Sequence, residues 1–248
     1  MGADSPEIAD AALDSLAAVA TRAAEKLRAE RRSTPSRVSD ALRDLITQGD
    51  LPPGTQLREV SLSQTLGVSR NTVREALRLL GHEGLVDYHI HRGVSVKRLT
   101  AEDVRELYRT REALELIAID YGAGARREAL EEISAVVSSA EEAAARGDWK
   151  EVATLDILFH QKIVQLIGSE HVESFFRRIV AELRLGFAAI DPPMHDRFVS
   201  WNRLLIDLLL AGDLERCRDE MRRYLLAAEE MICEALALRP APDSGTTA

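Results

Sequence analysis

The residues with the most evident chemistry lie between Ser69 and Leu80. This stretch holds three arginines, an asparagine, a serine and a threonine, all of which donate hydrogen bonds. Guanidinium and amide groups pair with base edges in the DNA major groove, and hydroxyls contact phosphates. Four apolar residues recur at the helical spacing i, i+3, i+4 and i+7: Val73, Ala76, Leu77 and Leu80. The pattern predicts a helix capped by Ser69, with one buried face and polar groups gathered at its N-terminus, as a recognition helix requires.

The segment that precedes this helix predicts a helix-turn-helix. Thr34 and Pro35 resemble a helix start, and the apolar residues that follow keep the helical period as far as Gly49. A short helix is predicted over residues 61–66, and Gly67 supplies the turn before Ser69. A helix, a short glycine-containing turn and a second helix with a polar N-terminus follow one another, which is the order of a helix-turn-helix.

Two β-prone segments, residues 85–88 and 93–97, follow the helix and predict a hairpin wing. The tip between them carries His89 to Arg92, and its candidate DNA-binding residues are His91, Arg92 and Gly93. Histidine and arginine at a hairpin tip suit a phosphate or the minor groove. An ordinary solvated hairpin is the alternative, but the position directly after a helix-turn-helix favours the wing.

Charge divides the 248 residues unequally. The formal net charge is −9, yet residues 36–98 hold nine Lys and Arg against seven Asp and Glu, and the remainder holds 23 against 34. An acidic protein is a poor candidate for indiscriminate binding to nucleic acid, although a local basic surface still docks. No signal peptide and no apolar run near the ~20 residues of a membrane span is visible, so we expect a cytoplasmic protein without a membrane partner.

The periodicity predicts a mostly α fold with two domains. Residues 34–98 form the winged helix-turn-helix, with three helices and a β-hairpin wing. Residues 99–238 form an all-helical antiparallel bundle, with six helices near 101–124, 126–146, 148–167, 170–190, 194–211 and 213–238. Residues 1–33 predict a weakly amphipathic helical extension, either frayed or packed on a partner subunit, and residues 239–248 predict a disordered tail.

Several spaced motifs in the first domain closely resemble the winged helix of the GntR superfamily of bacterial transcription regulators. By that resemblance Arg70 and Arg74 are the principal DNA contacts, with Ser69, Asn71 and Thr72 beside them. The resemblance also implies a homodimer that binds an inverted repeat in double-stranded DNA. One departure is Asn71-Thr72, where many members carry proline second. The motifs are LPPGTQL at 51–57, LGVSRNTVREAL at 66–77, EGLV at 83–86 and RGV at 92–94.

The helical half resembles the FCD group of that superfamily, which is FadR-like. In many members an Asp, a His four residues later and two further His hold a divalent metal such as zinc or nickel, in a bundle that also receives a small carboxylate. Asp156 and His160 match the first pair and share one helical face, whereas Asn202 and Tyr224 stand where the two histidines are expected. The matching motifs are REALE at 111–115, LDILFH at 155–160, AGD at 211–213 and MRRYL at 221–225.

Asparagine and neutral tyrosine are poor ligands for zinc or nickel, so the usual four-ligand site is incomplete and no cofactor is required. His171 and His195 are possible substitutes, but each is more simply a helix-end or loop histidine. The alternative is a metal-free pocket in which Asp156, His160, Asn202 and Tyr224 form a polar lining.

Arg111 is the candidate for the carboxylate of an organic acid or acyl effector, because guanidinium pairs bidentately with carboxylates. A salt bridge from Arg111 to Glu115 on the same helix face is the other interpretation.

Two functions remain. The first is a transcription regulator, a repressor in the commoner behaviour of the resembling superfamily, that responds to a small-molecule effector. The second is a metal-dependent enzyme of small carboxylates with a DNA-binding tether. The sequence has no HExxH, no nucleophile motif and no Gly-rich phosphate loop, so we favour the regulator and expect no enzyme.

Overall fold

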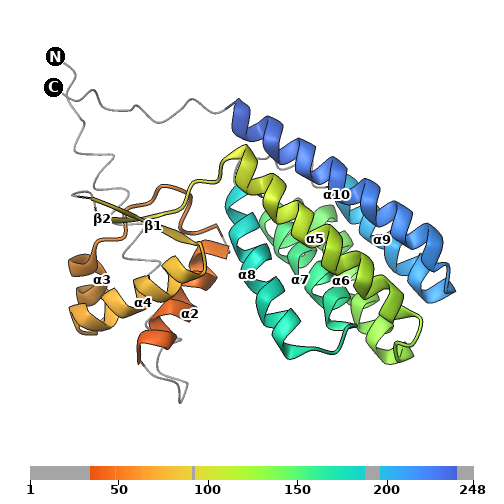
Figure 1. Cartoon of the computed structure of the whole chain (residues 1–248), viewed down its shortest axis with the longest axis horizontal. Helices are drawn as coiled ribbons and strands as arrows, with labels where there is room; N and C mark the ends of the chain where they lie inside the picture. Colours follow the sequence, from red (N-terminus) through yellow and green to blue (C-terminus); the bar gives the residue numbers. More distant parts are fainter. Residues whose placement is uncertain (1–33, 48, 91–92, 188–195, 239–248) are drawn as a thin grey trace. The chain divides into compact units, whose positions relative to one another are not determined.

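The computed structural model describes residues 34–47, 49–90, 93–187 and 196–238 (Figure 1). The contacts within the chain divide it into two compact units, one ending at Arg98 and the other beginning at Leu99. We call them the winged unit and the helical unit. The predicted extension over residues 1–33 and the predicted tail over 239–248 lie outside the described residues.

Three helices make the core of the winged unit: α2 (Thr34–Thr47), α3 (Glu59–Leu66) and α4 (Arg70–His82). Each turns its apolar face inward, and α2 and α3 both pack on α4. The predicted stripe of α4 is fully buried. Helix α3 begins two residues before the predicted start. The residue before it, Arg58, makes no side-chain capping bond, so the sequence holds no cap signal that marks this start. The core residues include Val38, Leu42, Ile46, Leu62, Val73, Ala76, Leu77, Leu80 and Leu85.

A two-stranded antiparallel hairpin follows α4, with β1 (Val86–His89) paired to β2 (Gly93–Val96). The first strand lies one residue later than predicted, so His89 pairs with Gly93 inside the hairpin and is not part of its tip. The other edge of β2 pairs with the loop between α2 and α3, where Gln56 forms a bridge with Ser95. The hairpin is therefore anchored on both sides of β2.

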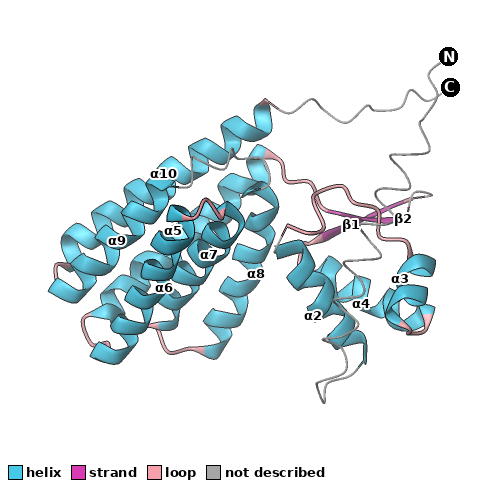
Figure 2. Cartoon of the chain, turned by 180° about the vertical axis from the view of Figure 1, so that it is seen from behind, coloured by secondary structure: helices cyan, strands magenta, loops and turns pink. Residues whose placement is uncertain are grey.

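The helical unit contains six helices within the described residues, and the described strands are confined to the winged unit (Figure 2). Thr100 begins the first helix with a capping box, in which its hydroxyl accepts from the Asp103 N–H and the Asp103 carboxylate accepts from the Thr100 N–H. The helices are α5 (Ala101–Gly122), α6 (Arg127–Ala145), α7 (Trp149–Gln165), α8 (Glu170–Phe187), α9 (Asp196–Ala211) and α10 (Leu214–Ala237).

Helix α7 lies at the centre of this bundle, where it contacts α5, α6, α8 and α9. Helices α5 and α10, the first and last of the unit, lie side by side (Figure 1). The predicted fold class, a winged helix-turn-helix followed by a helical bundle, is confirmed. Among the described residues, none of the helices combines the length and apolar character needed to cross a membrane.

Candidate functional site

The N-terminus of α4 is capped and exposed. The Ser69 hydroxyl accepts from the backbone N–H of Thr72 at 3.1 Å and lies 2.8 Å from the Thr72 hydroxyl. Arg70, Asn71 and Arg74 are exposed, whereas the opposite face of the helix is buried. The structure therefore brings the five predicted contact residues of this helix to one end of it, where four of them are exposed and Thr72 is half-buried. We call Ser69, Arg70, Asn71, Thr72 and Arg74 the reading face.

One arginine of the reading face has a fixed partner. Arg74 donates from Nε to Glu59 Oε1 at 3.1 Å and from Nη2 to Glu59 Oε2 at 2.9 Å, and so joins α4 to the first turn of α3. These bonds lower the pKa of the Glu59 carboxyl, so it is ionised at neutral pH. Arg78, one turn further along α4, makes a single bond of 3.2 Å to Glu75 on the same helix.

The wing is described in part. His89 Nε2 lies 2.9 Å from the Ser95 hydroxyl across the hairpin. Gly93 begins β2 with φ of +80°, a conformation that favours glycine. His91 and Arg92, the predicted tip contacts, lie outside the described residues, so of the three wing residues Gly93 alone is placed.

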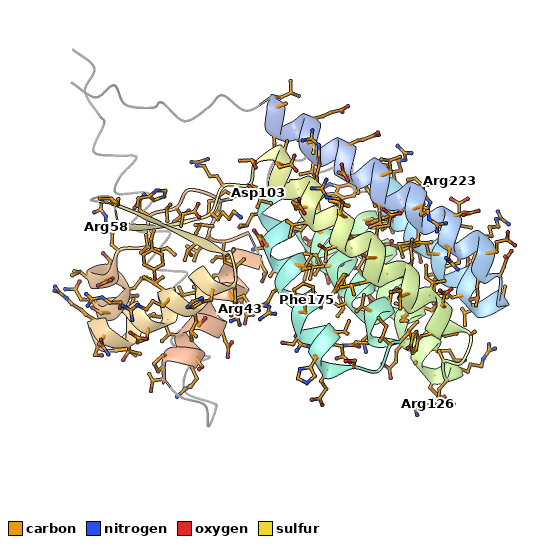
Figure 3. The ribbon with its side chains drawn as sticks, viewed as in Figure 1. Arg43, Arg58, Asp103, Arg126, Phe175 and Arg223 are labelled. Atoms are coloured by element: carbon orange, nitrogen blue, oxygen red, sulfur yellow. The ribbon has the colours of Figure 1, made fainter. Side chains whose placement is uncertain are left out.

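A second group of polar residues is buried inside the helical unit. Arg111 and Glu115 come from α5, Asp156 and His160 from α7, Asn202 from α9 and Tyr224 from α10, and all six are buried. We call these six residues the buried polar centre. Arg223, the neighbour of Tyr224 along α10, lies on the outside of the same helix (Figure 3). The structure thus brings together all five predicted effector residues, around the central helix.

Hydrogen bonds divide the centre into two parts. Arg111 Nε donates to Glu115 Oε1 at 2.7 Å, and His160 Nδ1 lies 2.5 Å from Glu115 Oε2. Around the other carboxylate, Asn202 Nδ2 and the Tyr224 hydroxyl both donate to Asp156 Oδ1 at 2.8 Å. His160 Nε2 stands 3.9 Å from that same oxygen, which brings the two parts close to each other. The salt bridge from Arg111 to Glu115, one of the two interpretations from the sequence, is therefore present.

Charge pairing outweighs burial at Glu115. Burial by itself raises the pKa of this carboxyl, but the nearby Arg111 and His160 lower it below the ordinary value. An ionised carboxylate only accepts hydrogen bonds, so His160 Nδ1 must carry the proton between them. At Tyr224 burial and the nearby Asp156 act in the same direction and raise the pKa of the phenol well above its ordinary value. Tyr224 therefore stays a neutral donor.

Three atoms of the centre have no hydrogen-bond partner within the described part of the chain. They are Arg111 Nη2, His160 Nε2 and Asn202 Oδ1, and the hydroxyl of the buried Tyr108 beside Arg111 is in the same state. A buried polar group without a partner costs about 1–3 kcal/mol, so native proteins rarely leave several together. The centre thus offers both donor and acceptor groups to a further molecule.

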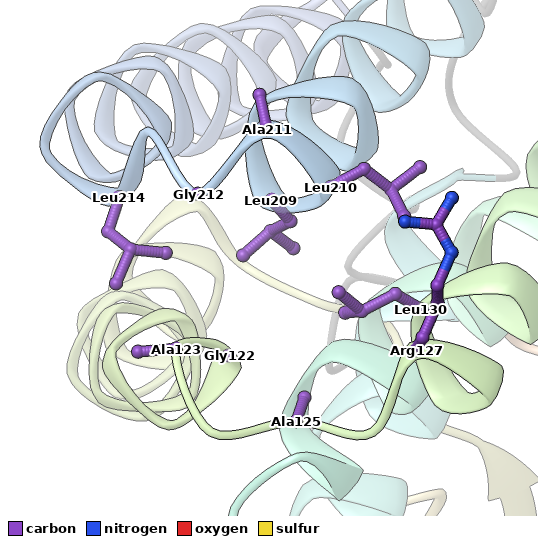
Figure 4. Close-up of a pocket in the computed structure, with 10 residues that line it drawn as sticks. All are labelled: Gly122, Ala123, Ala125, Arg127, Leu130, Leu209, Leu210, Ala211, Gly212 and Leu214. Atoms are coloured by element: carbon purple, nitrogen blue, oxygen red, sulfur yellow. The ribbon is translucent and has the colours of Figure 1, made fainter.

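A hollow of about 370 Å³ lies elsewhere in the helical unit, between the connection from α5 to α6 and the connection from α9 to α10 (Figure 4). Its lining consists of glycine, alanine and leucine together with Arg127. Arg127 is exposed and already pairs with Glu131. The lining therefore offers a ligand fewer polar side-chain groups than the buried polar centre does.

Comparison with known proteins matches both units. Residues 34–96 match the family model of bacterial regulatory proteins, gntR family, and residues 106–227 match the FCD domain. A protein named as probable repressor of the D-xylose utilization operon in Paenarthrobacter nicotinovorans is 31% identical over 202 residues, which are 81% of this chain and 89% of that relative. The chain belongs to the GntR family. It is a member that carries an FCD domain.

Solved structures of the GntR family have the same fold. One from Rhodococcus sp. RHA1, described as a GntR transcriptional regulator, is 33% identical and covers 84% of this chain and all of that one, with a TM-score of 0.77. The McbR regulator of Escherichia coli covers 82% of this chain and 99% of its own, with a TM-score of 0.73 at 22% identity, which is a likeness of fold. The predicted family and group are confirmed.

The residues of this FCD domain do not fit the metal that the resemblance implies. Asp156 Oδ1 already accepts from both Asn202 and Tyr224, so two protons occupy the lone pairs of that oxygen. His160 offers Nε2, but the residues at the two expected histidine positions turn N–H and O–H groups toward the carboxylate. The described residues contain no group of three or more His, Cys, Asp or Glu side chains placed to hold a metal ion. His171 is exposed on α8, and His195 lies outside the described residues.

Sequence reasoning missed two residues near the centre. Buried Tyr108 stacks against Arg111, and Arg184 on α8 is buried close enough to Asp156 for the two charges to interact. Arg184 follows the buried Phe176 and Val180 at steps of four, so it continues an apolar face of α8. A lone arginine at such a position is the signal that would have found it.

Proposed function

We propose that this GntR-family regulator binds an operator through the reading face of α4 and is controlled by a small organic acid or acyl compound held at the buried polar centre. The observation that supports DNA binding is the exposure of Arg70, Asn71 and Arg74 on a capped helix whose other face is buried. The unit around this helix also holds an excess of basic residues in an otherwise acidic chain.

A homodimer places two such helices in successive major grooves of an inverted repeat, with Gly93 and the neighbouring wing residues His91 and Arg92 against the backbone. In this proposal residues 34–98 are the DNA-binding domain and residues 99–238 the effector-binding and dimerisation domain. The regulator acts in the cytoplasm, where bacterial DNA lies, as a repressor whose effector releases it.

The effector proposal rests on the unpartnered atoms of the centre. The carboxylate of an acid would accept from Arg111 Nη2 and, where His160 is protonated, from His160 Nε2. A donor group on the same molecule would satisfy Asn202 Oδ1. Such a ligand contacts α5, α7 and α9 together, and α5 begins three residues after Arg98, the last residue of the winged unit. A shift of α5 is thereby passed along the chain to the winged unit.

The test begins with selection of DNA by the full chain from a library of randomised duplexes. The expected result is a short inverted repeat, and enrichment of no sequence would contradict the proposal. Binding of that duplex is then titrated with hydroxy acids, dicarboxylates and fatty-acyl compounds, each of which is also scored for a rise in melting temperature. Arg111→Gln should abolish the response, and Arg127→Gln, at the surface hollow, should retain it.

A further inference from the structure

The pair formed by Arg74 and Glu59 joins a basic residue of the reading face to an acidic one beside it. An acidic side chain here repels DNA phosphates, so its presence lowers affinity for any duplex. The pair is also exposed, with 51% of the Arg74 side chain and 29% of the Glu59 side chain accessible. An exposed pair of this kind adds little to the stability of a fold. Its effect on stability is therefore small, because α3 already packs on α4 and Leu62 and Val73 of these helices are buried.

The geometry of the pair suggests another effect. Glu59 takes the side of the guanidinium that is formed by Nε and one proton of Nη2. Three further N–H groups remain, and those of Nη1 and Nη2 point in parallel from the other edge. Two parallel N–H groups are what guanine O6 and N7 accept in the major groove. Glu59 thus fixes the plane of the guanidinium and leaves the edge that reads a base.

We infer that Glu59 is a positioning residue that orients Arg74 toward a base edge and so makes it a determinant of operator sequence. This inference rests on the proposed DNA binding. Glu59 itself touches no base: its carboxylate restricts the rotation of a long side chain that would otherwise choose freely between a base and the nearest phosphate. Arg78 supplies the contrast, because Glu75 holds it through one bond and leaves its orientation less restricted.

The experiment uses the full chain and the duplex that the wild type selects. Affinity is measured for this duplex and for a set in which each base pair of one half-site is changed in turn. Glu59→Gln should reduce discrimination at one base pair by roughly tenfold or more, because a neutral amide cannot form the two charged bonds. Arg74→Ala should lose discrimination at the same base pair, and in the Arg74→Ala background Glu59→Gln should cause no further loss.

Glu75→Gln is the matched control, because it removes the same charge from the same surface and should preserve discrimination at every base pair. Affinity of Glu59→Gln for a duplex of unrelated sequence should equal or exceed that of the wild type, since a negative charge is gone.

Full discrimination in Glu59→Gln would overturn the inference, as would an equal loss of affinity for every duplex, which would mark a role in folding. Both outcomes leave the proposed function intact. A wild type that selects no DNA sequence would instead overturn the proposed function and this inference with it.

Discussion

Arg74 and Arg111 are each held by a glutamate, but water reaches the first pair and not the second. The side chains of Arg74, on the reading face, and of Glu59 beside it are 51% and 29% exposed, whereas those of Arg111 and Glu115 are 2% and 0% exposed. Arg74 can exchange Glu59 for another partner at little cost in free energy, because water hydrates the charged groups that separate. Breaking the Arg111 pair leaves a buried charge without a partner in a medium of low polarity. The first arrangement suits a surface that meets DNA and leaves it, and the second suits a site of fixed shape.

The largest effect should come from Glu115→Gln. Removal of one partner from a buried ion pair costs about 3–5 kcal/mol, because the remaining charge keeps its desolvation penalty. Both tryptophans of the chain, Trp149 and Trp201, lie in the helical unit, so their fluorescence during urea unfolding reports on that unit.

Glu131→Gln provides the control for this comparison. Arg127 and Glu131 have the same i, i+4 spacing as the buried pair, and Arg127 Nε likewise donates to a glutamate oxygen, here at 3.0 Å. Their side chains, however, are 75% and 58% exposed. The expected loss is about 0.5 kcal/mol or less. Similar losses in the two variants would show that burial does not distinguish the pairs.

Arg70→Ala should lower affinity for the operator and leave the stability of the fold almost unchanged. Loss of a base contact weakens binding to the selected operator by about 1–3 kcal/mol, while an exposed arginine contributes little to the fold. Anisotropy of a labelled duplex measures the first quantity, and helical circular dichroism during heating measures the second. Unchanged operator affinity would show that Arg70 makes no energetically important contact with DNA.

Tyr224→Phe should have a smaller effect on the helical unit. The variant removes the hydroxyl that donates to Asp156 and leaves Asn202 as the remaining donor to that oxygen. We expect a loss of about 1–2 kcal/mol in the unfolding followed by tryptophan fluorescence. Tyr121→Phe, at an exposed tyrosine of α5, should change nothing measurable, and an equal loss there would contradict the role given to the buried hydroxyl.

The smallest effect concerns metal. Because two donors already occupy Asp156 Oδ1, zinc or nickel should leave the melting temperature of the wild type unchanged, and a chelator should do the same. Asn202→His with Tyr224→His replaces both donors by imidazoles and should create a zinc-dependent rise in melting temperature. A chelator-sensitive wild type would show that the hydrogen bonds around Asp156 give way to a cation.

The sequence predicted the winged unit well because its signals are local. A serine cap, a turn glycine and an apolar stripe each act within a few residues, and the structure has all three at the predicted places. The pairing of Gln56 with Ser95 was not predicted, since residues 39 positions apart in the chain show no shared periodicity.

The buried polar centre was predicted as a set of residues but not as a network. Asp156, His160, Asn202 and Tyr224 were named through resemblance, yet which donor satisfies which acceptor depends on how four helices meet. Glu115 was considered as a partner of Arg111 and proves to hold His160 as well. The polar atoms on these side chains outnumber the bonds that they form, and no linear pattern reveals such a mismatch.

The pairing of α5 with α10 also affects how the protein is made. Synthesis proceeds from the N-terminus, so the winged unit can fold while the ribosome still holds the helical unit. Asp156 leaves the ribosome 68 residues before the tyrosine that donates to it, and α5 has no α10 to cover it until the end. Every nascent chain therefore passes through a stage at which the winged unit is complete but the bundle is not. Translation that stops before Leu214 would leave the chain without α10.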